Sequence, residues 1–202
     1  MSKAKIAVLV SGGGTNLGAL IDAQGSVITS GEITLVISNK EGAYALTRAA
    51  NAGIKSETVL RKNCNSKEEF EDKILALLKE NDIDMIVLGG FLAVLSERFV
   101  KEYPERIINI HPSLIPKHCG DGFYGLKVHE SVLASGDKVT GATVHYVNEI
   151  TDGGEIIFQK EVPVMEGDTP EILQKRVMEQ AEWIILPKAT ELVAKKIVEE
   201  SK

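Results

Sequence analysis

An asparagine and a histidine two residues apart are the first candidates for chemistry in this sequence. Asn109 and His111 lie in an isoleucine-rich stretch, residues 106–111, that predicts a buried strand. Alternate residues of a strand point to the same face, so both polar side chains would lie together at its carboxyl end, where open α/β folds bind ligands. Taken alone, His111 fits a hydrogen-bonded core histidine equally well. The pair favours a site in which an amide and a protonated imidazole donate hydrogen bonds to a developing oxyanion.

Asp152 is the third candidate, because it opens an Asp-Gly-Gly turn downstream of the pair. An aspartate in this position most often only shapes the turn. If the turn folds back over the sheet edge, its carboxylate would reach His111, orient the imidazole and raise its pKa. No serine or cysteine has the context of a nucleophile, so we expect the substrate to bring its own. No metal is expected, because the side chains that could bind one have no regular zinc-site spacing. These side chains are His111, His118, Cys119 and His129.

A glycine-rich loop, Ser11 to Asn16, follows the first predicted strand and precedes a helix. Free backbone N–H groups and the helix dipole favour an anion there. A tight turn alone would need one glycine, whereas this loop has three in succession. The dinucleotide fingerprint and the P-loop lysine are both missing, so the loop favours a phosphomonoester over a nicotinamide cofactor or a nucleoside triphosphate.

These candidates lie within an alternation of predicted strands and helices. The clearest helix begins at Ser66, which forms a capping box with Glu69, and an Ala-rich helix ends at Gly53. The alternation indicates a parallel sheet covered on both faces. Apolar runs predict its strands at residues 6–10, 33–38, 58–60, 84–88 and 106–111.

The pattern changes after residue 111. Residues 112–125 predict a long loop, and two later runs, 139–147 and 156–164, predict strands that pair antiparallel. A final helix begins at Thr169 and is expected to break or kink at Pro187. We therefore expect an α/β fold, a single three-layer Rossmann-like domain with a mostly parallel sheet and an antiparallel addition near the C-terminus.

Composition limits the class of protein. The chain has 202 residues, 44% hydrophobic, and no apolar stretch long enough for a membrane span or a signal peptide, so we expect one domain over residues 1–202, in the cytosol. A formal charge of −6 argues against nucleic-acid and membrane-surface partners. Cys64 and Cys119 are expected to be free thiols of a reducing compartment.

The motifs together resemble the signature of folate-dependent formyltransferases. The resemblance lies in three motifs: the segment from Asn109 to Pro116, the Thr151-Asp152-Gly153-Gly154 turn about 40 residues later, and the glycine-rich loop from Ser11 to Asn16. The resemblance runs from Ile6 to about Pro187. It implies transfer of a formyl group from 10-formyltetrahydrofolate, a cosubstrate, to the amino group of glycinamide ribonucleotide in purine biosynthesis. The substrate amine would then be the missing nucleophile.

Matching the family's motifs position by position implies a role for each candidate residue. The catalytic set would be Asn109, His111 and Asp152. The ribonucleotide would be held by Gly13, Gly14, Thr15, Asn16 and Glu182. The folate would contact Lys67, Leu92, Ala93, Val94, Leu95 and Asn109. Two features depart from the family, since many relatives carry arginine at position 93 and a Tyr-Pro-Gly version of the loop at 117–125.

Three alternatives stay open at this stage. A formyltetrahydrofolate hydrolase would use water in place of the amine, and the phosphate loop weighs against it. Methionyl-tRNA formyltransferase would use the same Asn/His/Asp set, but it is a longer chain with a basic tRNA-binding domain, which 202 residues with a charge of −6 do not offer. A non-catalytic nucleotide-binding module would lack an assembled Asn/His/Asp set. The expected partners are small-molecule substrates, and the chain would be a monomer or a homodimer.

Overall fold

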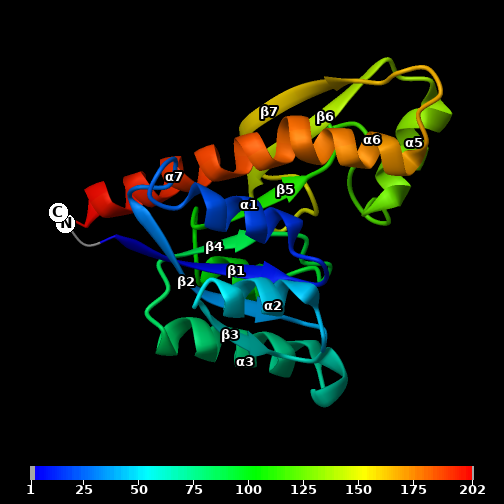
Figure 1. The fold of residues 1–202 in the computed structure, drawn as a ribbon. Helices are drawn as coiled ribbons and strands as arrows, with labels where there is room; N and C mark the ends of the chain where they lie inside the picture. The colour runs from blue at the N-terminus through cyan, green and yellow to red at the C-terminus, as the bar shows by residue number, and fades with distance from the viewer. Residues whose placement is uncertain (1–2, 202) are drawn as a thin grey trace.

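The computed structural model describes residues 3–201, and its centre is a seven-stranded sheet in the order β3-β2-β1-β4-β5-β6-β7 (Figure 1). Neighbours among the first five strands pair in parallel, whereas β5–β6 and β6–β7 are antiparallel. The expected sheet is therefore confirmed. The strands are β1 (Ala4–Val10), β2 (Gly31–Ser38), β3 (Lys55–Thr58), β4 (Met85–Leu88), β5 (Ile107–His111), β6 (Val139–Tyr146) and β7 (Ile156–Pro163).

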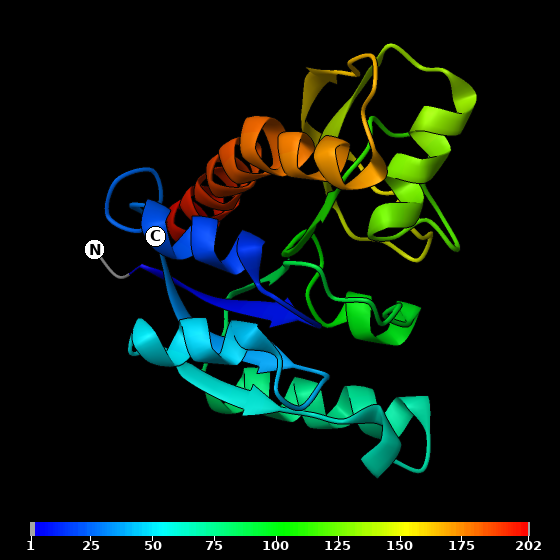
Figure 2. The same cartoon turned by 45° about the vertical axis from the view of Figure 1, so that its right-hand side comes forward.

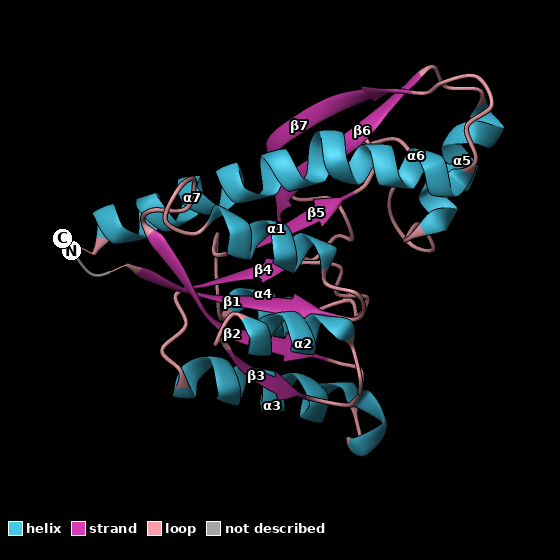
Figure 3. Cartoon of the chain, viewed as in Figure 1, coloured by secondary structure: helices cyan, strands magenta, loops and turns pink. Residues whose placement is uncertain are grey.

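Helices cover both faces of the sheet, which confirms the three-layer arrangement (Figure 3). Ile6, Val8 and Val10 of β1 pack with α1, α2, α6 and α7, while Ala7 and Leu9 pack with α3 and α4 on the other face. None of the helices between residues 3 and 201 is long and apolar enough to cross a membrane. The helices are α1 (Thr15–Ala23), α2 (Tyr44–Asn51), α3 (Lys67–Glu80), α4 (Glu97–Lys101), α5 (Leu126–Ser135), α6 (Pro170–Val177) and α7 (Trp183–Glu200).

Helix boundaries follow the expected capping residues. The Ser66 hydroxyl accepts a hydrogen bond from the Glu69 N–H at 3.1 Å and begins α3. The Glu69 carboxylate, however, accepts from the N–H of Asn65 at 2.7 Å, so the reciprocal half of the capping box lies one residue earlier than expected. Gly53, just after α2, has φ 68° and terminates that helix as predicted.

The third strand and one helix differ from the prediction. β3 spans Lys55–Thr58 rather than 58–60, because it is an edge strand that pairs only with β2 and therefore needs no apolar run. Helix α5 was not predicted. It follows directly on the loop of residues 112–125, and glycines, Gly125 and Gly136, stand at its ends in place of polar capping residues. It contacts α6 and carries the buried residues Val128, His129 and Val132.

The helix does not break at Pro187, so that half of the expectation is wrong; a kink there stays a prediction. Residues 170–200 are helical throughout, as α6, a π-helical stretch (Met178–Glu182) and α7 (Figure 2). Pro187 lies inside α7, where its missing N–H removes a hydrogen bond without ending the helix. The irregular hydrogen bonding lies upstream instead, in the π-helical stretch, a feature often found at functional sites.

The sheet determines where a ligand site can form. β1, β4 and β5 are adjacent and parallel, so their carboxyl ends meet at one edge. The glycine loop follows β1, residues 89–96 follow β4, and β5 ends at His111. The turn between β6 and β7 begins opposite the start of β5 and folds back, so that Asp152 reaches the side chains of Asn109 and His111.

Candidate active site

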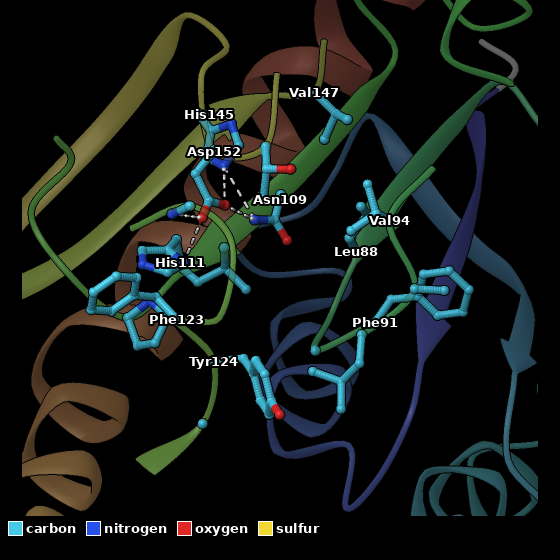
Figure 4. A pocket seen from close by; sticks show the side chains of 18 of the residues that line it. Leu88, Phe91, Val94, Asn109, His111, Phe123, Tyr124, His145, Val147 and Asp152 are labelled. Carbon is cyan, nitrogen blue, oxygen red and sulfur yellow. Dashed lines mark hydrogen bonds and ion pairs between the residues drawn. The ribbon is translucent and has the colours of Figure 1, made fainter. Parts of the chain in front are cut away.

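Asn109, His111 and Asp152 are brought together, and His145 joins them (Figure 4). The antiparallel register of β5 and β6 places Asn109 directly opposite His145. Nδ2 of Asn109 lies 3.1 Å from Nε2 of His145 and 3.5 Å from Oδ1 of Asp152. Nδ1 of His111 lies 3.5 Å from Oδ2 of Asp152. The predicted set is therefore assembled around one carboxylate.

The Asp152 carboxylate stays ionised although only 9% of its side chain is exposed. Burial raises its pKa, but the contacts with His145, His111 and the Gly120 N–H together outweigh burial and hold the pKa below its ordinary value. The Gly120 N–H donates to Oδ2 at 2.9 Å. Asp152 itself has φ 54°, a left-handed conformation that is uncommon for aspartate and fits the tight turn.

The pKa of His111 lies below its ordinary value, although Asp152 raises it as expected. Burial of the imidazole, of which 5% is exposed, outweighs the opposing effects of Asp152 and of the His118 carbonyl. The imidazole is consequently neutral at pH 7. Its Nε2 lies 2.9 Å from the carbonyl oxygen of His118. Because a carbonyl only accepts, Nε2 carries the proton of the neutral ring.

The glycine loop has the hydrogen-bonding pattern of an anion site. The carbonyls of Gly12, Gly13 and Gly14 accept from Ala45, Arg48 and Gly18 respectively. Among residues 3–201, no protein acceptor receives the N–H groups of these three glycines. The N–H groups that begin α1 are free in the same way. The loop therefore directs donors outward at the start of a helix.

Glu182 and Asn16 form a buried pair beside this loop. Nδ2 of Asn16 donates to Oε2 of Glu182 at 2.8 Å, and the two residues are 8% and 6% exposed. The π-helical stretch ends at Glu182 and joins it to α7. Burial raises the pKa of Glu182 to about 7, opposed only by the Asn16 hydrogen bond. Its protonation state therefore changes close to neutral pH.

One cavity of about 360 Å³ joins these groups, a size typical of small-molecule sites. Most of the predicted residues line it, namely Thr15, Asn16, Leu92, Ala93, Val94, Leu95, Asn109, His111, Asp152 and Glu182. Gly13 and Gly14 precede Thr15 in the chain but are not part of the lining, and neither is Lys67. The amino group of Lys67 lies 3.9 Å from Glu71 on the same helix. Lys67 as a folate contact stays a prediction.

The segment 91–95 is anchored at both ends by hydrogen bonds. The Leu92 N–H donates to the Ser11 hydroxyl at 2.9 Å. The Ser96 N–H donates to the Glu71 carboxylate at 2.8 Å, and Glu71 is 1% exposed. Leu92 and Val94 are about half exposed, at 51% and 57%. These apolar side chains offer a flat ligand a surface beside the cluster of Asn109, His111 and Asp152.

Two functional neighbours were not identified from the sequence. His145 falls within the strand predicted at residues 139–147, and only its register opposite Asn109 reveals its contact with Asp152. His129 lies on the unpredicted helix α5, lines the cavity and is fully buried. Within residues 3–201 neither of its ring nitrogens has a hydrogen-bond partner, and burial lowers its pKa to about 4. The hydrophobic periodicity of a single segment shows neither the contact of His145 with Asp152 nor the burial of His129 in the cavity wall.

The other reactive side chains do not suggest a nucleophile or a metal centre. Burial, followed by the charge of Asp152, raises the pKa of the Cys119 thiol, so the reactive thiolate is disfavoured. Cys64 and Cys119 are both free thiols. Within the described residues, no group of three or more His, Cys, Asp or Glu side chains is arranged to hold a metal ion.

Comparisons with known proteins agree with this geometry. A family model described as formyl transferase matches residues 4–190. The chain is 43% identical to a phosphoribosylglycinamide formyltransferase of Haemophilus influenzae, covering 91% of this chain and 84% of that protein. It is similar in structure to glycinamide ribonucleotide transformylase 1 from Symbiobacterium toebii, with a TM-score of 0.90 at 36% identity over 96% of this chain and 89% of that one.

The chain also resembles part of a longer protein. It is 46% identical to the trifunctional purine biosynthetic protein adenosine-3 of Gallus gallus over 96% of its own length. It spans 19% of that protein. The match is therefore to one portion of a chain that carries other functions elsewhere.

Glu182→Gln is expected to stabilise the protein at alkaline pH. A carboxyl with a folded-state pKa of about 7 binds a proton that the unfolded chain releases above about 4.5, so the wild type loses stability as pH rises between these values. Glutamine keeps an acceptor for Asn16 without a charge. The free energy of unfolding at pH 8 should rise by on the order of 3 kcal/mol, with little change near pH 4.5, in urea titrations. An equal effect at both pH values would contradict a raised pKa.

Proposed function

This chain is a member of the formyl transferase family, and we propose that it transfers the formyl group of 10-formyltetrahydrofolate to the amino group of glycinamide ribonucleotide in purine biosynthesis. The observation that carries the proposal is that one cavity contains both the Asn109/His111/Asp152 cluster and the Asn16–Glu182 pair beside the anion loop. A phosphorylated amine and a formyl donor can therefore meet at the cluster. The names of the similar proteins from Haemophilus influenzae and Symbiobacterium toebii, a phosphoribosylglycinamide formyltransferase and a glycinamide ribonucleotide transformylase, support the same conclusion.

In the proposed reaction the amine attacks the formyl carbon and its lone pair forms the new C–N bond. The carbonyl electrons move to oxygen, which becomes an oxyanion. Asn109 supplies a hydrogen bond to it, because one amide hydrogen is used by His145 at 3.1 Å while the other has only a long, 3.5 Å contact with Asp152. His145 is fixed in this role because its Nδ1 donates to the carbonyl of Tyr146 at 2.8 Å.

His111 has a different role from the one its pattern suggested. A neutral imidazole adds no positive charge to an oxyanion, but its unprotonated nitrogen can accept a proton. The oxyanion electrons then re-form the carbonyl, and the bond between the formyl carbon and the folate nitrogen breaks. The attacking nitrogen must lose a proton and the departing folate nitrogen must gain one. We assign this transfer to His111, through water where the atoms do not touch. The resulting imidazolium would be stabilised by Asp152 at 3.5 Å and by the His118 carbonyl at 2.9 Å.

The ribonucleotide and the folate would occupy different parts of the cavity. The N–H groups of Gly13, Gly14 and Thr15 would hold the phosphate, with Asn16 and Glu182 toward the amine-bearing end. The pterin would lie along residues 91–95. Ala93 offers no guanidinium there, so contacts to the folate would come from the anchored backbone and from apolar side chains. A cytosolic location and a monomeric or homodimeric state stay predictions.

Dependence on the amine separates a transferase from a hydrolase. Release of tetrahydrofolate from 10-formyltetrahydrofolate, followed by absorbance, should require glycinamide ribonucleotide and match the formylated product one to one. The proposal predicts negligible turnover without the amine. Equal rates with and without it would replace the transferase with a hydrolase, and no turnover in either case would favour a binding module.

Gly13→Val should weaken ribonucleotide binding without unfolding the chain. A Cβ at position 13 meets no heavy atom within 4 Å, so the side chain would fill the space in front of the loop. We expect KM for the ribonucleotide to rise at least about tenfold, since a phosphate contact to an N–H is a charge-assisted hydrogen bond, while KM for the folate stays unchanged. Gly14 is unsuitable for this test, because a Cβ there would lie 2.6 Å from Cβ of Ala45. An equal rise in both KM values would remove the loop from phosphate binding.

Asp152→Asn should lower kcat by about 100-fold, the lower end of typical acid–base contributions. Because the carboxylate raises the pKa of His111 against burial, its loss should also move the acidic limb of the pH–rate profile to lower pH. Asp82→Asn is the matched control, since Asp82 has a similar φ of 51° but pairs only with Lys5 at the surface. A wild-type rate in the Asp152 variant would remove this residue from the mechanism.

A further inference from the structure

The carbonyl oxygen that faces Nε2 of His111 belongs to another histidine, His118, whose ring points elsewhere. The His118 ring lines a second hollow with Lys117 and Asp137, and His118 is absent from the lining of the main cavity. We propose that His118 is a positioning residue for His111, held in place by Ser131 and Asp137. The proposal rests on the proposed function of the same site and adds three residues to its machinery.

Both ring nitrogens of His118 are held by side chains from outside its own loop. Nδ1 lies 2.8 Å from the hydroxyl of Ser131 on α5, and Nε2 lies 2.8 Å from Oδ2 of Asp137, just before β6. The ring edge also meets Phe123, with centroids 6.5 Å apart at 65°. The His118 side chain is 13% exposed. The ring is therefore fixed from two sides, and we call Ser131 and Asp137 its clamp.

The clamp holds a backbone conformation that histidine rarely adopts. His118 has φ 51°, which costs an L-residue with a side chain on the order of 1 kcal/mol or more unless its surroundings compensate. This conformation presents the His118 carbonyl to His111 at 2.9 Å. Two residues later, the Gly120 N–H reaches Asp152 at 2.9 Å. One short segment thus contributes an acceptor to His111 and a donor to Asp152.

The electrostatic surroundings make the His118 carbonyl important for His111. Asp152 and this carbonyl raise the pKa of the imidazole, while burial and His145 lower it, and the uncharged ring of His129 lies nearby. Without the carbonyl, the Nε2 proton of His111 would be a buried donor with no acceptor. The ring would then lose both its fixed tautomer and part of its affinity for a proton.

Neither clamp residue lines the main cavity, and both contact His118, so we expect their effect on turnover to pass through His118. The charged side chains that contact the clamp are those of His118, when protonated, and Lys117. Asp137 also pairs with Lys117 at 3.1 Å, and the side chain of Lys117 is 68% exposed. The hydrogen bonds to His118 and Lys117 hold the pKa of Asp137 at about 2, so it stays ionised throughout the working range.

The test compares variants of the clamp in the full chain. Asp137→Ala and Ser131→Ala should each lower kcat about tenfold, the effect of one net hydrogen bond, with both KM values within twofold of the wild type. The acidic limb of the pH–rate profile should move to lower pH. Asp137→Asn keeps an acceptor for Nε2 of His118 and should recover most of the rate. A role in folding alone would lower the melting temperature without moving the pH profile.

Two controls and a spectroscopic readout make the result decisive. Lys117→Met removes the ion pair but leaves the clamp, and Glu130→Gln changes an exposed neighbour of Ser131; both should retain wild-type kcat. NMR titration of the chain's four histidines reports the tautomer and pKa of His111 without turnover. The midpoint of the His111 titration should move to lower pH in the Asp137→Ala variant. Unchanged kcat and an unchanged His111 titration in both clamp variants would overturn the proposal. A shifted titration in a chain without amine-dependent transfer would keep the clamp and reject the proposed function.

Discussion

The site depends on keeping one buried carboxylate ionised. Asp152 is 9% exposed, and an isolated charge at that depth would be neutralised by a shift of its pKa. Its partners come from three separate segments: His111 ends β5, His145 lies on β6, and Gly120 belongs to the loop that follows β5. The carboxylate therefore ties the antiparallel hairpin and the loop to the parallel part of the sheet.

The same balance between burial and partners sets the proton chemistry. Burial lowers the pKa of His111 and raises that of Glu182, and in each case nearby hydrogen bonds oppose the shift. One group is thereby neutral at pH 7 and the other changes its charge there. An ionised Glu182 lowers stability, which is the usual conflict between a functional site and the fold that holds it.

The departures from the family pattern lie where the backbone supplies the contact. Position 93 carries alanine, yet the segment around it is held by Ser11 at Leu92 and by buried Glu71 at Ser96. Its position is thus independent of the side chain at residue 93. The unusual loop likewise contacts the catalytic cluster through a backbone carbonyl and a backbone N–H. Such contacts tolerate a change of residue type as long as the conformation is preserved.

Local patterns alone determined most of the strands, the glycine loop and the grouping of Asn109 with His111, because alternation and capping act over a few residues. The motif spacing also related the chain to its family. Only the tertiary structure decided that His145 faces Asn109, that Lys67 turns to Glu71, and that burial outweighs Asp152 at His111. Register between strands and the depth of a side chain depend on residues far apart in the chain, and no single segment encodes them.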